Sequence, residues 1–397
     1  MDAVKLRAWY SHRQGLDGRL LGTDPASVLA ETGWARSVGG SAPYLSLFAR
    51  CGASRERMDA DLAAAVILES PAARACTYVI PGEEAALALR VAEGSGSLQE
   101  MNAARKLGVT DEEIDRLCQG VLRELAGGPL EPAALTAAVG PLTRSLGEEG
   151  KKKGIGTTMP LALGRLQAEG EIRRISLNGR LDNQRYKYAS WEPNPLRGRA
   201  PTRAEAMEEL ARKFFDWIGP ASVAEFAAFA ALGVGAAKEA CAGLGLVAVD
   251  ATGLMMRQGA MEAFEAFRAP SEPRYVLTSS LDAIVLLRRE MQSLIEPSDR
   301  ERLIVGDKGA TPLGLLGEAP SHLILDRGRI VGLWEYDPEA QEIVWSAFVG
   351  KSEGLMAAVR KMEAFVRDEL GDARSFSLDS PKSRAPKIAA LREAATV

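Results

Sequence analysis

The stretch GEIRRISLNGRLDNQRYKYA, residues 170–189, decides the fold. Two strand-like runs, 171–177 with two isoleucines and 180–189 with two tyrosines, flank the dipeptide Asn178-Gly179. Asn-Gly between two such runs is the strongest short-range signal for a β-hairpin, because both residues tolerate the positive φ angles of a tight turn. The sequence therefore predicts a hairpin with a two-residue turn at this point.

Two helices precede the predicted hairpin. Residues 135–139 lie in a short apolar helix, and a loop rich in glycine and lysine follows at 150–156. The hydroxyl of Thr157 or Thr158 can cap the helix that comes next. Helix, loop, helix and hairpin is the element order of a winged helix, which we expect over residues 128–193.

Two further winged helices are expected, over residues 1–90 and 202–258, with a helical connector over 91–127. In the first unit, Asp24-Pro25 has the N-cap and first-turn chemistry of a helix start. In the third, the segment Ser222–Glu225 forms a capping box ahead of an apolar helix. The winged-helix order thus recurs three times at unequal spacing.

After residue 270 the chain changes from helical patterns to short strand-like runs. These runs are Tyr275–Thr278, His322–Leu325, Arg329–Glu335 and Glu342–Phe348. Such runs, separated by turns, predict a small antiparallel β-barrel over 270–350, and a helix and tail follow over 351–397. The predicted fold class is α+β: three tandem winged-helix units, a small antiparallel β-barrel and a C-terminal helix.

Positive charge is concentrated in the second unit. Residues 144–187 contain ten lysines and arginines against five acids, whereas the whole chain has a formal net charge of −4. A local excess of positive charge attracts a polyanion even when the total is near zero. The excess positive charge of this unit therefore predicts a surface that binds duplex DNA. The alternative is a winged helix that serves only to pack against the rest of the protein. The candidate contact residues are Lys151, Lys152, Lys153, Thr158, Arg165, Arg173, Arg174, Arg180, Arg185 and Lys187.

Composition excludes several other classes of protein. Hydrophobic residues make up 46% of the chain and charged residues 26%, which excludes a disordered or collagen-like chain. The longest uncharged apolar run, Phe226–Ala237, is too short to span a bilayer, and the N-terminus lacks the apolar core of a signal peptide, so we expect a cytoplasmic protein. The four cysteines form no Cys-x-x-Cys pair, and His12 and His322 are 310 positions apart. We therefore expect neither a metal site nor a cofactor.

Motifs for other chemistry are weak. The triplet His12-Arg13-Gln14 is expected on the surface of the first helix. The loop at 150–156 lacks the spacing of a phosphate-binding loop, and the chain has no Gly-x-Ser-x-Gly element. Glu69 and Asp282 are isolated carboxylates; either could orient water, but most such residues are structural or lie on the surface.

Seven segments of the chain resemble one known family. They are HRQGL (12–16), RACTYVIP (74–81), GPL (128–130), LQAEGEI (166–172), GPASVAEFAAFAAL (219–232), SLDAIVLL (280–287) and LDRGRIVGLWEYD (325–337). Together they resemble the AlkZ/YcaQ-type DNA glycosylases of interstrand-crosslink repair. The resemblance covers nearly the whole chain and implies three tandem winged helices, a β-barrel, and double-stranded DNA, alkylated or crosslinked, as the partner.

The resemblance also implies where catalysis would occur. The family's signature is a Gln-x-Gln or Gln-x-Asp pair in the first unit, which positions water against the sugar as an alkylated base leaves. The best matching stretch is residues 33–40, in which the two positions fall at Arg36 and Val38. Neither side chain orients water as a glutamine or an aspartate does. We therefore assign no catalytic residue, interpret Arg36 as a DNA contact, and expect the Gly39-Gly40 turn to suit close approach of a phosphate.

The leading functional prediction is a monomeric DNA-binding repair protein that lacks this glutamine pair and releases no alkylated base. Two alternatives stay open. One is an active glycosylase that hydrolyses the N-glycosidic bond with a different loop residue. The other is a transcription regulator, which requires a dimer with spaced half-sites, although no heptad pattern supports one.

Overall fold

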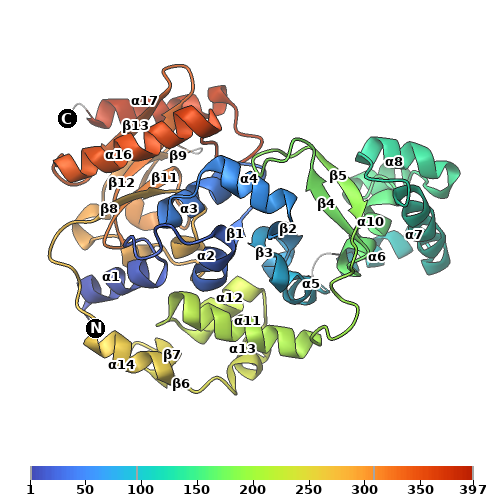
Figure 1. Cartoon of the computed structure of the whole chain (residues 1–397), viewed down its shortest axis with the longest axis horizontal. Coiled ribbons are helices and arrows are strands. Elements are labelled where there is room, and N and C mark those ends of the chain that lie inside the picture. The colour runs from blue at the N-terminus through green and yellow to red at the C-terminus, as the bar shows by residue number, and fades with distance from the viewer. Residues whose placement is uncertain (1, 95–96, 307–308, 396–397) are drawn as a thin grey trace.

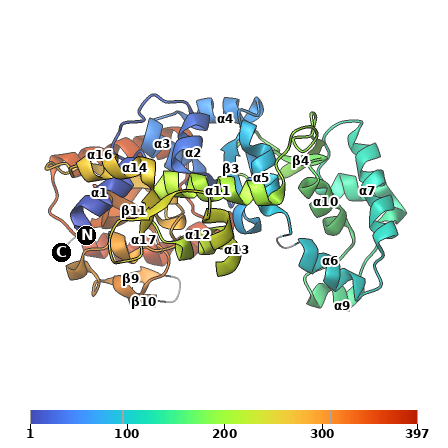
Figure 2. The ribbon, with the colours of Figure 1, turned by 90° about the horizontal axis from the view of Figure 1, so that it is seen from below.

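The computed structural model describes residues 2–94, 97–306 and 309–395. It is a mixed α/β structure in which the described strands form five separate antiparallel sheets. Figures 1 and 2 show that the segment from helix α6 (Ser97–Arg105) to strand β5 (Tyr186–Ser190) lies at one end of the molecule. We call this segment the end unit. It has its own apolar core, whereas two other apolar clusters fill the main body.

The N-terminal region contains five helices and one three-stranded sheet. Asp24 caps the second helix as predicted, because its side chain accepts a hydrogen bond from the Ser27 amide at 2.9 Å. Strand β3 lies between β1 and β2. The elements are α1 (Ala3–Arg13), α2 (Pro25–Thr32), β1 (Ala35–Arg36), α3 (Ala42–Cys51), α4 (Arg55–Ala63), β2 (Ile67–Pro71), β3 (Thr77–Pro81) and α5 (Ala85–Ala92).

The end unit packs helices against one hairpin. After α6 its elements are α7 (Asp111–Leu125), α8 (Pro132–Val139), α9 (Gly147–Lys152), α10 (Met159–Ala168), β4 (Ile172–Ser176) and β5. The predicted loop at 150–156 is partly wrong, since α9 occupies its first residues. Two acids in the first turn and two lysines in the last favour this short helix, because they complement its dipole and pair three positions apart.

The predicted two-residue hairpin turn is also wrong: nine residues, 177–185, connect β4 to β5. The Arg180 amide donates to Ser176 Oγ and Asn178 Oδ1, so the chain does turn at Asn178-Gly179. Leu181 then leaves the hairpin and is fully buried in the core of the main body, where its amide donates to Tyr44 Oη at 2.9 Å. This tertiary contact draws the loop away from the strands and docks it on helix α3 of the N-terminal region.

The third region is helical with one short hairpin. The Ser222–Glu225 capping box is confirmed, with both reciprocal hydrogen bonds formed. Phe214, Phe226 and Phe229 join the region to the main apolar cluster. The elements are α11 (Arg203–Ile218), α12 (Val223–Ala230), α13 (Val234–Cys241), β6 (Leu246–Ala248), β7 (Met255–Arg257) and α14 (Gln258–Ala266).

The predicted β-barrel is wrong: in the described residues the last region contains an open four-stranded sheet of order β13-β12-β11-β8. Its edge strands do not meet, because β9 (Leu303–Gly306) and β10 (Gly309–Pro312) pair with each other instead of closing the sheet. The sheet strands are β8 (Tyr275–Thr278), β11 (His322–Asp326), β12 (Arg329–Asp337) and β13 (Glu342–Ala347).

Two C-terminal helices pack on this sheet (Figure 1). Helix α16 (Glu353–Phe365) contacts β8, and α17 (Pro381–Ala395) lies across β12 and β13. The tail predicted after the C-terminal helix is therefore partly helical, and it buries Arg384, Ile388 and Leu391. In the part of the chain that the structure describes, no helix is long and apolar enough to cross a membrane.

Candidate functional site

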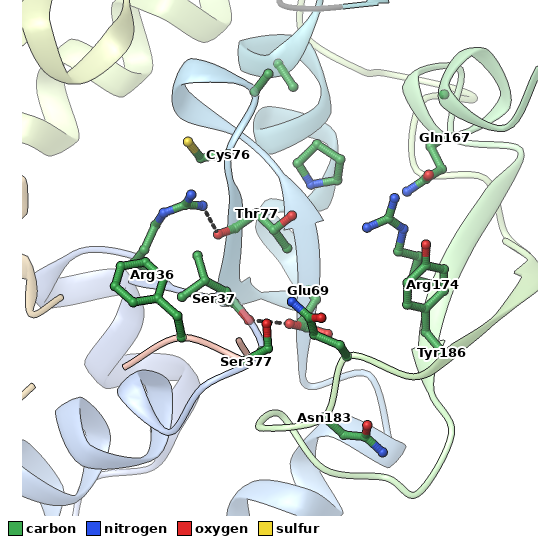
Figure 3. Close-up of a pocket in the computed structure, with 18 of the residues that line it drawn as sticks. Arg36, Ser37, Glu69, Cys76, Thr77, Gln167, Arg174, Asn183, Tyr186 and Ser377 are labelled. Carbon is green, nitrogen blue, oxygen red and sulfur yellow. Dashed lines mark hydrogen bonds between the residues drawn. The ribbon is translucent and has the colours of Figure 1, made fainter. Parts of the chain in front are cut away.

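A cavity of about 820 Å³ lies between the first sheet and the end unit (Figure 3). One wall comes from the end of β1, from β2 and from the start of β3, and the other from α10, β4 and β5. Residues of α5, of α6 and of the loop between β4 and β5 also line it. Residues 376–378 complete the lining. They belong to the segment between the C-terminal helices that we call the strap, residues 372–378. The cavity therefore gathers segments far apart in the sequence.

Strand register determines which side chains of the first sheet share a face. Ala35 of β1 and Glu69 of β2 both lie opposite Val79 of β3, so all three point to the same face. Ser37, two positions beyond Ala35, returns to that face, whereas Arg36 points to the other. The antiparallel register thus brings together a serine and a glutamate that are 32 positions apart.

Glu69 carries its carboxylate into the cavity, where Ser37 Oγ donates a hydrogen bond to Oε1 (Figure 3). Loss of hydration raises the pKa of Glu69, while the Ser37 hydrogen bond and the positive charge of Arg174 oppose that rise. Within the described chain, Glu69 forms no ion pair and its Oε2 has no hydrogen-bond partner. The sequence hypothesis that Glu69 is an isolated carboxylate does not account for this placement.

An arginine and one aromatic ring, that of Tyr186, form part of the opposite wall. The Arg174 guanidinium lies 4.5 Å from the Tyr186 ring centroid and 5.8 Å from that of Tyr188. Gln167 of α10 lines the cavity beside them (Figure 3). Arg174 is exposed, and among the described residues it has no carboxylate partner, so its charge is available to a ligand.

Arg36, predicted as a DNA contact, is instead held by the protein. Its Nη1 donates to the Thr77 carbonyl at 2.8 Å, and its guanidinium lies 5.5 Å from the Tyr78 ring centroid. Val38 lines the cavity wall, and its carbonyl accepts a hydrogen bond from the Ser377 amide at 3.3 Å. The two positions at which the resemblance places a catalytic pair thus hold a tethered guanidinium and an apolar side chain.

The glycines at 39 and 40 permit close approach of the protein's own chain. A Cβ at Gly40 would lie 2.2 Å from the Ser375 carbonyl oxygen, and one at Gly39 would lie 2.3 Å from Gln184 Cγ. The Ser41 amide donates to the Arg374 carbonyl at 2.9 Å. The prediction that this turn approaches a phosphate is therefore replaced by a structural role: the strap fixes the loop that carries Ser37.

The predicted phosphate contacts divide into two groups. Five are paired with acids: Lys151 with Glu148, Lys152 with Glu149, Arg165 with Asp115 and Glu169, Arg180 with Asp182, and Arg185 with Glu131. Four have no carboxylate within 4.0 Å in the described chain: Lys153, Arg173, Arg174 and Lys187. Thr158 is fully buried and accepts a hydrogen bond from the Arg144 amide, so it is not available to DNA.

A second polar cluster is enclosed in the main body and was missed by the sequence hypotheses. Arg50 forms two hydrogen bonds with Asp282, at 2.7 and 2.8 Å, and a third with Gln14 Oε1 at 2.9 Å. Gln14 Nε2 donates to the carbonyls of Thr32 and Trp217. Arg50, Asp282 and Gln14 are almost completely buried, so the predicted surface position of Gln14 is wrong. This network joins three regions of the chain: the N-terminal region, the third region and the last region.

Comparisons with known proteins agree with this architecture. Residues 30–372 match the family model described as DNA glycosylase AlkZ-like. The fold is similar to that of the Streptomyces sahachiroi DNA glycosylase AlkZ, with a TM-score of 0.70 and 20% identity over 94% of this chain and 98% of that chain. No curated protein matched the chain. Because the family match spans most of its length, the chain belongs to the DNA glycosylase AlkZ-like family.

Proposed function

We propose that the protein binds duplex DNA and receives one nucleobase, rotated out of the double helix, in the cavity between the first sheet and the end unit. The observation that carries the proposal is the cavity itself, with polar groups of Ser37 and Glu69 on one wall and Arg174 over Tyr186 on the other. Its volume of about 820 Å³ falls within the range of small-molecule sites. Proteins that act on a base take it out of the stack, because their side chains cannot reach it inside the duplex.

The chemistry of the walls suits a base. A planar guanidinium over a tyrosine ring offers a stacking surface with positive charge, which accepts any base. The Gln167 carboxamide offers both a donor and an acceptor for a base edge. Glu69 Oε2 offers an acceptor with no partner in the described protein.

We assign the segments 1–90, 128–193 and 202–258 to winged-helix units, of which the second supplies the backbone contacts. Its unpaired cations neutralise phosphates, whereas a cation already paired with an acid presents little net charge. Arg173 is the clearest case, because burial lowers its pKa and no acid in the described chain compensates. A phosphate would relieve that penalty.

Two apolar side chains at the cavity favour a protein that rotates a base out of the double helix over one that reads base edges in the intact duplex. Phe376 and Leu378 of the strap are 45% and 88% exposed and line the cavity. Proteins that distort DNA insert apolar wedges between base steps, where they replace a lost stacking partner. A transcription regulator reads base edges within the stack and needs no such cavity. These features favour repair over regulation.

The test compares three duplexes of one sequence: intact, with one abasic analogue, and with one N7-methylguanine. We expect about tenfold tighter binding of the two damaged duplexes, because their unstacking penalty is smaller. A 2-aminopurine at the target position should brighten on binding. Arg174→Ala should reduce the preference, and Lys152→Ala, which removes an exposed cation paired with Glu149, should retain it. Equal affinity for all three duplexes without a fluorescence change would refute base rotation and favour the regulator.

A further inference from the structure

We propose that Glu69 is the catalytic carboxylate of this cavity and that Ser37 is its positioning residue. The inference rests on the proposed function. It gives the chain a means of base excision that Arg36 and Val38 do not supply. Glu69 Oε2 activates the water that attacks C1′ of the rotated nucleotide.

The placement of Glu69 carries the first step. It comes from β2, while the positions of the expected glutamine pair lie at the end of β1, and the register through β3 puts Glu69 and Ser37 on one face. The carboxylate therefore lies beside the loop in which the resemblance places the family's water-positioning residues. Strand β2 thus places a carboxylate at the position where the family's pair would hold water.

The hydrogen bonding of the carboxylate carries the second step. Ser37 Oγ donates a hydrogen bond to Oε1 and so fixes the orientation of the Glu69 carboxylate. Oε2 has no hydrogen-bond partner in the described chain. An acceptor with a free lone pair on a cavity wall binds water or a substrate donor. Ser37 is itself held, because its amide donates to the Thr77 carbonyl at 3.0 Å and the adjoining residues pack against the strap.

Electrostatics carries the third step. Glycosidic cleavage builds positive charge on the sugar, and a carboxylate at the cavity wall stabilises that charge. Burial raises the pKa of Glu69, which makes its carboxylate a stronger base for the proton of a bound water. The other charged or titratable groups of the lining are Arg36, which is tied to Thr77, and Cys76, Glu100, Arg174 and Tyr186.

The reaction balances with water as the only co-reactant. The bond between C1′ and the base nitrogen breaks, and both electrons leave with the base. A purine alkylated at N7 or N3 is cationic before cleavage, so it departs neutral and needs no general acid. The water oxygen forms the new bond to C1′, and its proton passes to Oε2 of Glu69 and then to solvent. The products are the free base and an abasic sugar.

The test is single-turnover base release from the N7-methylguanine duplex by the full chain. We expect release by the wild type and a loss of about 100-fold or more in Glu69→Gln, since general-base catalysis contributes that much. DNA affinity should change by no more than about threefold, which separates chemistry from binding. Glu83→Gln is the matched control, because Glu83 is an exposed carboxylate of the same N-terminal region that does not line the cavity, and it should leave the rate unchanged.

Ser37→Ala separates positioning from structure. Loss of the donated hydrogen bond raises the pKa of Glu69, so the rise of the release rate with pH should move to higher pH. Ser37→Thr keeps a hydroxyl and should restore the wild-type profile. A merely structural serine would lower the rate equally at every pH. Thermal melts of each variant show whether the fold is retained.

The outcomes are distinguishable from failure of the proposed function. If the wild type prefers damaged duplexes but releases no base, the catalytic inference is overturned and base binding stands. If it shows no preference for damaged duplexes, the proposed function itself fails. Release by Glu69→Gln within about threefold of the wild type, or an equal loss in Glu83→Gln, also overturns the assignment.

Discussion

Replacing Lys153, Arg173 and Lys187 with alanine tests which cations of the end unit contact DNA. In the described chain these side chains have no acidic partner, so each is free to neutralise one phosphate. Each lost contact lowers the slope of log affinity against log salt by about 0.9, and three contacts lower it by about 2.7. Between about 50 and 200 mM salt, the wild-type advantage should therefore shrink by about 40-fold.

The assay is fluorescence anisotropy of a labelled duplex over a salt series. The matched control removes the same three charges from the same unit, at Lys151, Lys152 and Arg165, all of which are paired with acids. Because these ion pairs have little net charge, we expect the control to lower the slope by less than about one unit. Equal slopes for both triple variants would show that total charge governs binding, and would refute the argument from free cations.

Three further predictions concern stability and the cavity mouth. Arg50→Met leaves Asp282 buried without its charge partner and should lower the free energy of unfolding in urea by about 3–5 kcal/mol; a change below about 1 kcal/mol would contradict this. Burial lowers the pKa of His322 from 6.5 to about 4. The free energy of unfolding should therefore fall by about 3 kcal/mol as the pH drops from 6.5 to about 4, because the unfolded chain binds the proton first. Burial raises the pKa of Glu335 to about 7, so the contribution of Glu335 makes the free energy of unfolding fall as pH rises, which opposes the effect of His322. In Glu335→Gln this opposing contribution is absent, and the free energy of unfolding should increase from pH 4 to 6.5. Phe376→Ala should reduce the preference for an abasic duplex over an intact one without changing the salt slope, and an unchanged preference would remove the strap from the DNA interface.

Local chemistry made part of the fold predictable. The Asp24 cap and the Ser222–Glu225 box depend on residues within one turn of each other, and both form as expected. The length of the loop between β4 and β5 was not predictable, because it depends on the burial of Leu181 beside Tyr44, which is 137 positions away in the sequence. The open sheet was missed for the same reason: strand-like runs indicate strands, but not which edges remain unpaired.

The enclosed network shows a similar limit for buried polar residues. Gln14 and Asp282 read as a surface residue and an isolated acid because Arg50, which joins them, lies 36 and 232 positions away. A buried charge needs a partner, but the sequence does not say which residue provides it. Only the packing of α3 against the last region identifies the pair.

The site illustrates why a missing motif is weak evidence of missing chemistry. The sequence predicts binding without excision by considering residues 36 and 38 alone, where an arginine and a valine stand. In a sheet, however, a neighbouring strand reaches the same location in space, and the register decides which of its side chains arrive there. Glu69 arrives on the face of Ser37, whereas Arg36 turns to Tyr78 on the other face. Arg36 also lines the cavity, but its guanidinium is tied to the Thr77 carbonyl, and the positive charge that acts on Glu69 is that of Arg174.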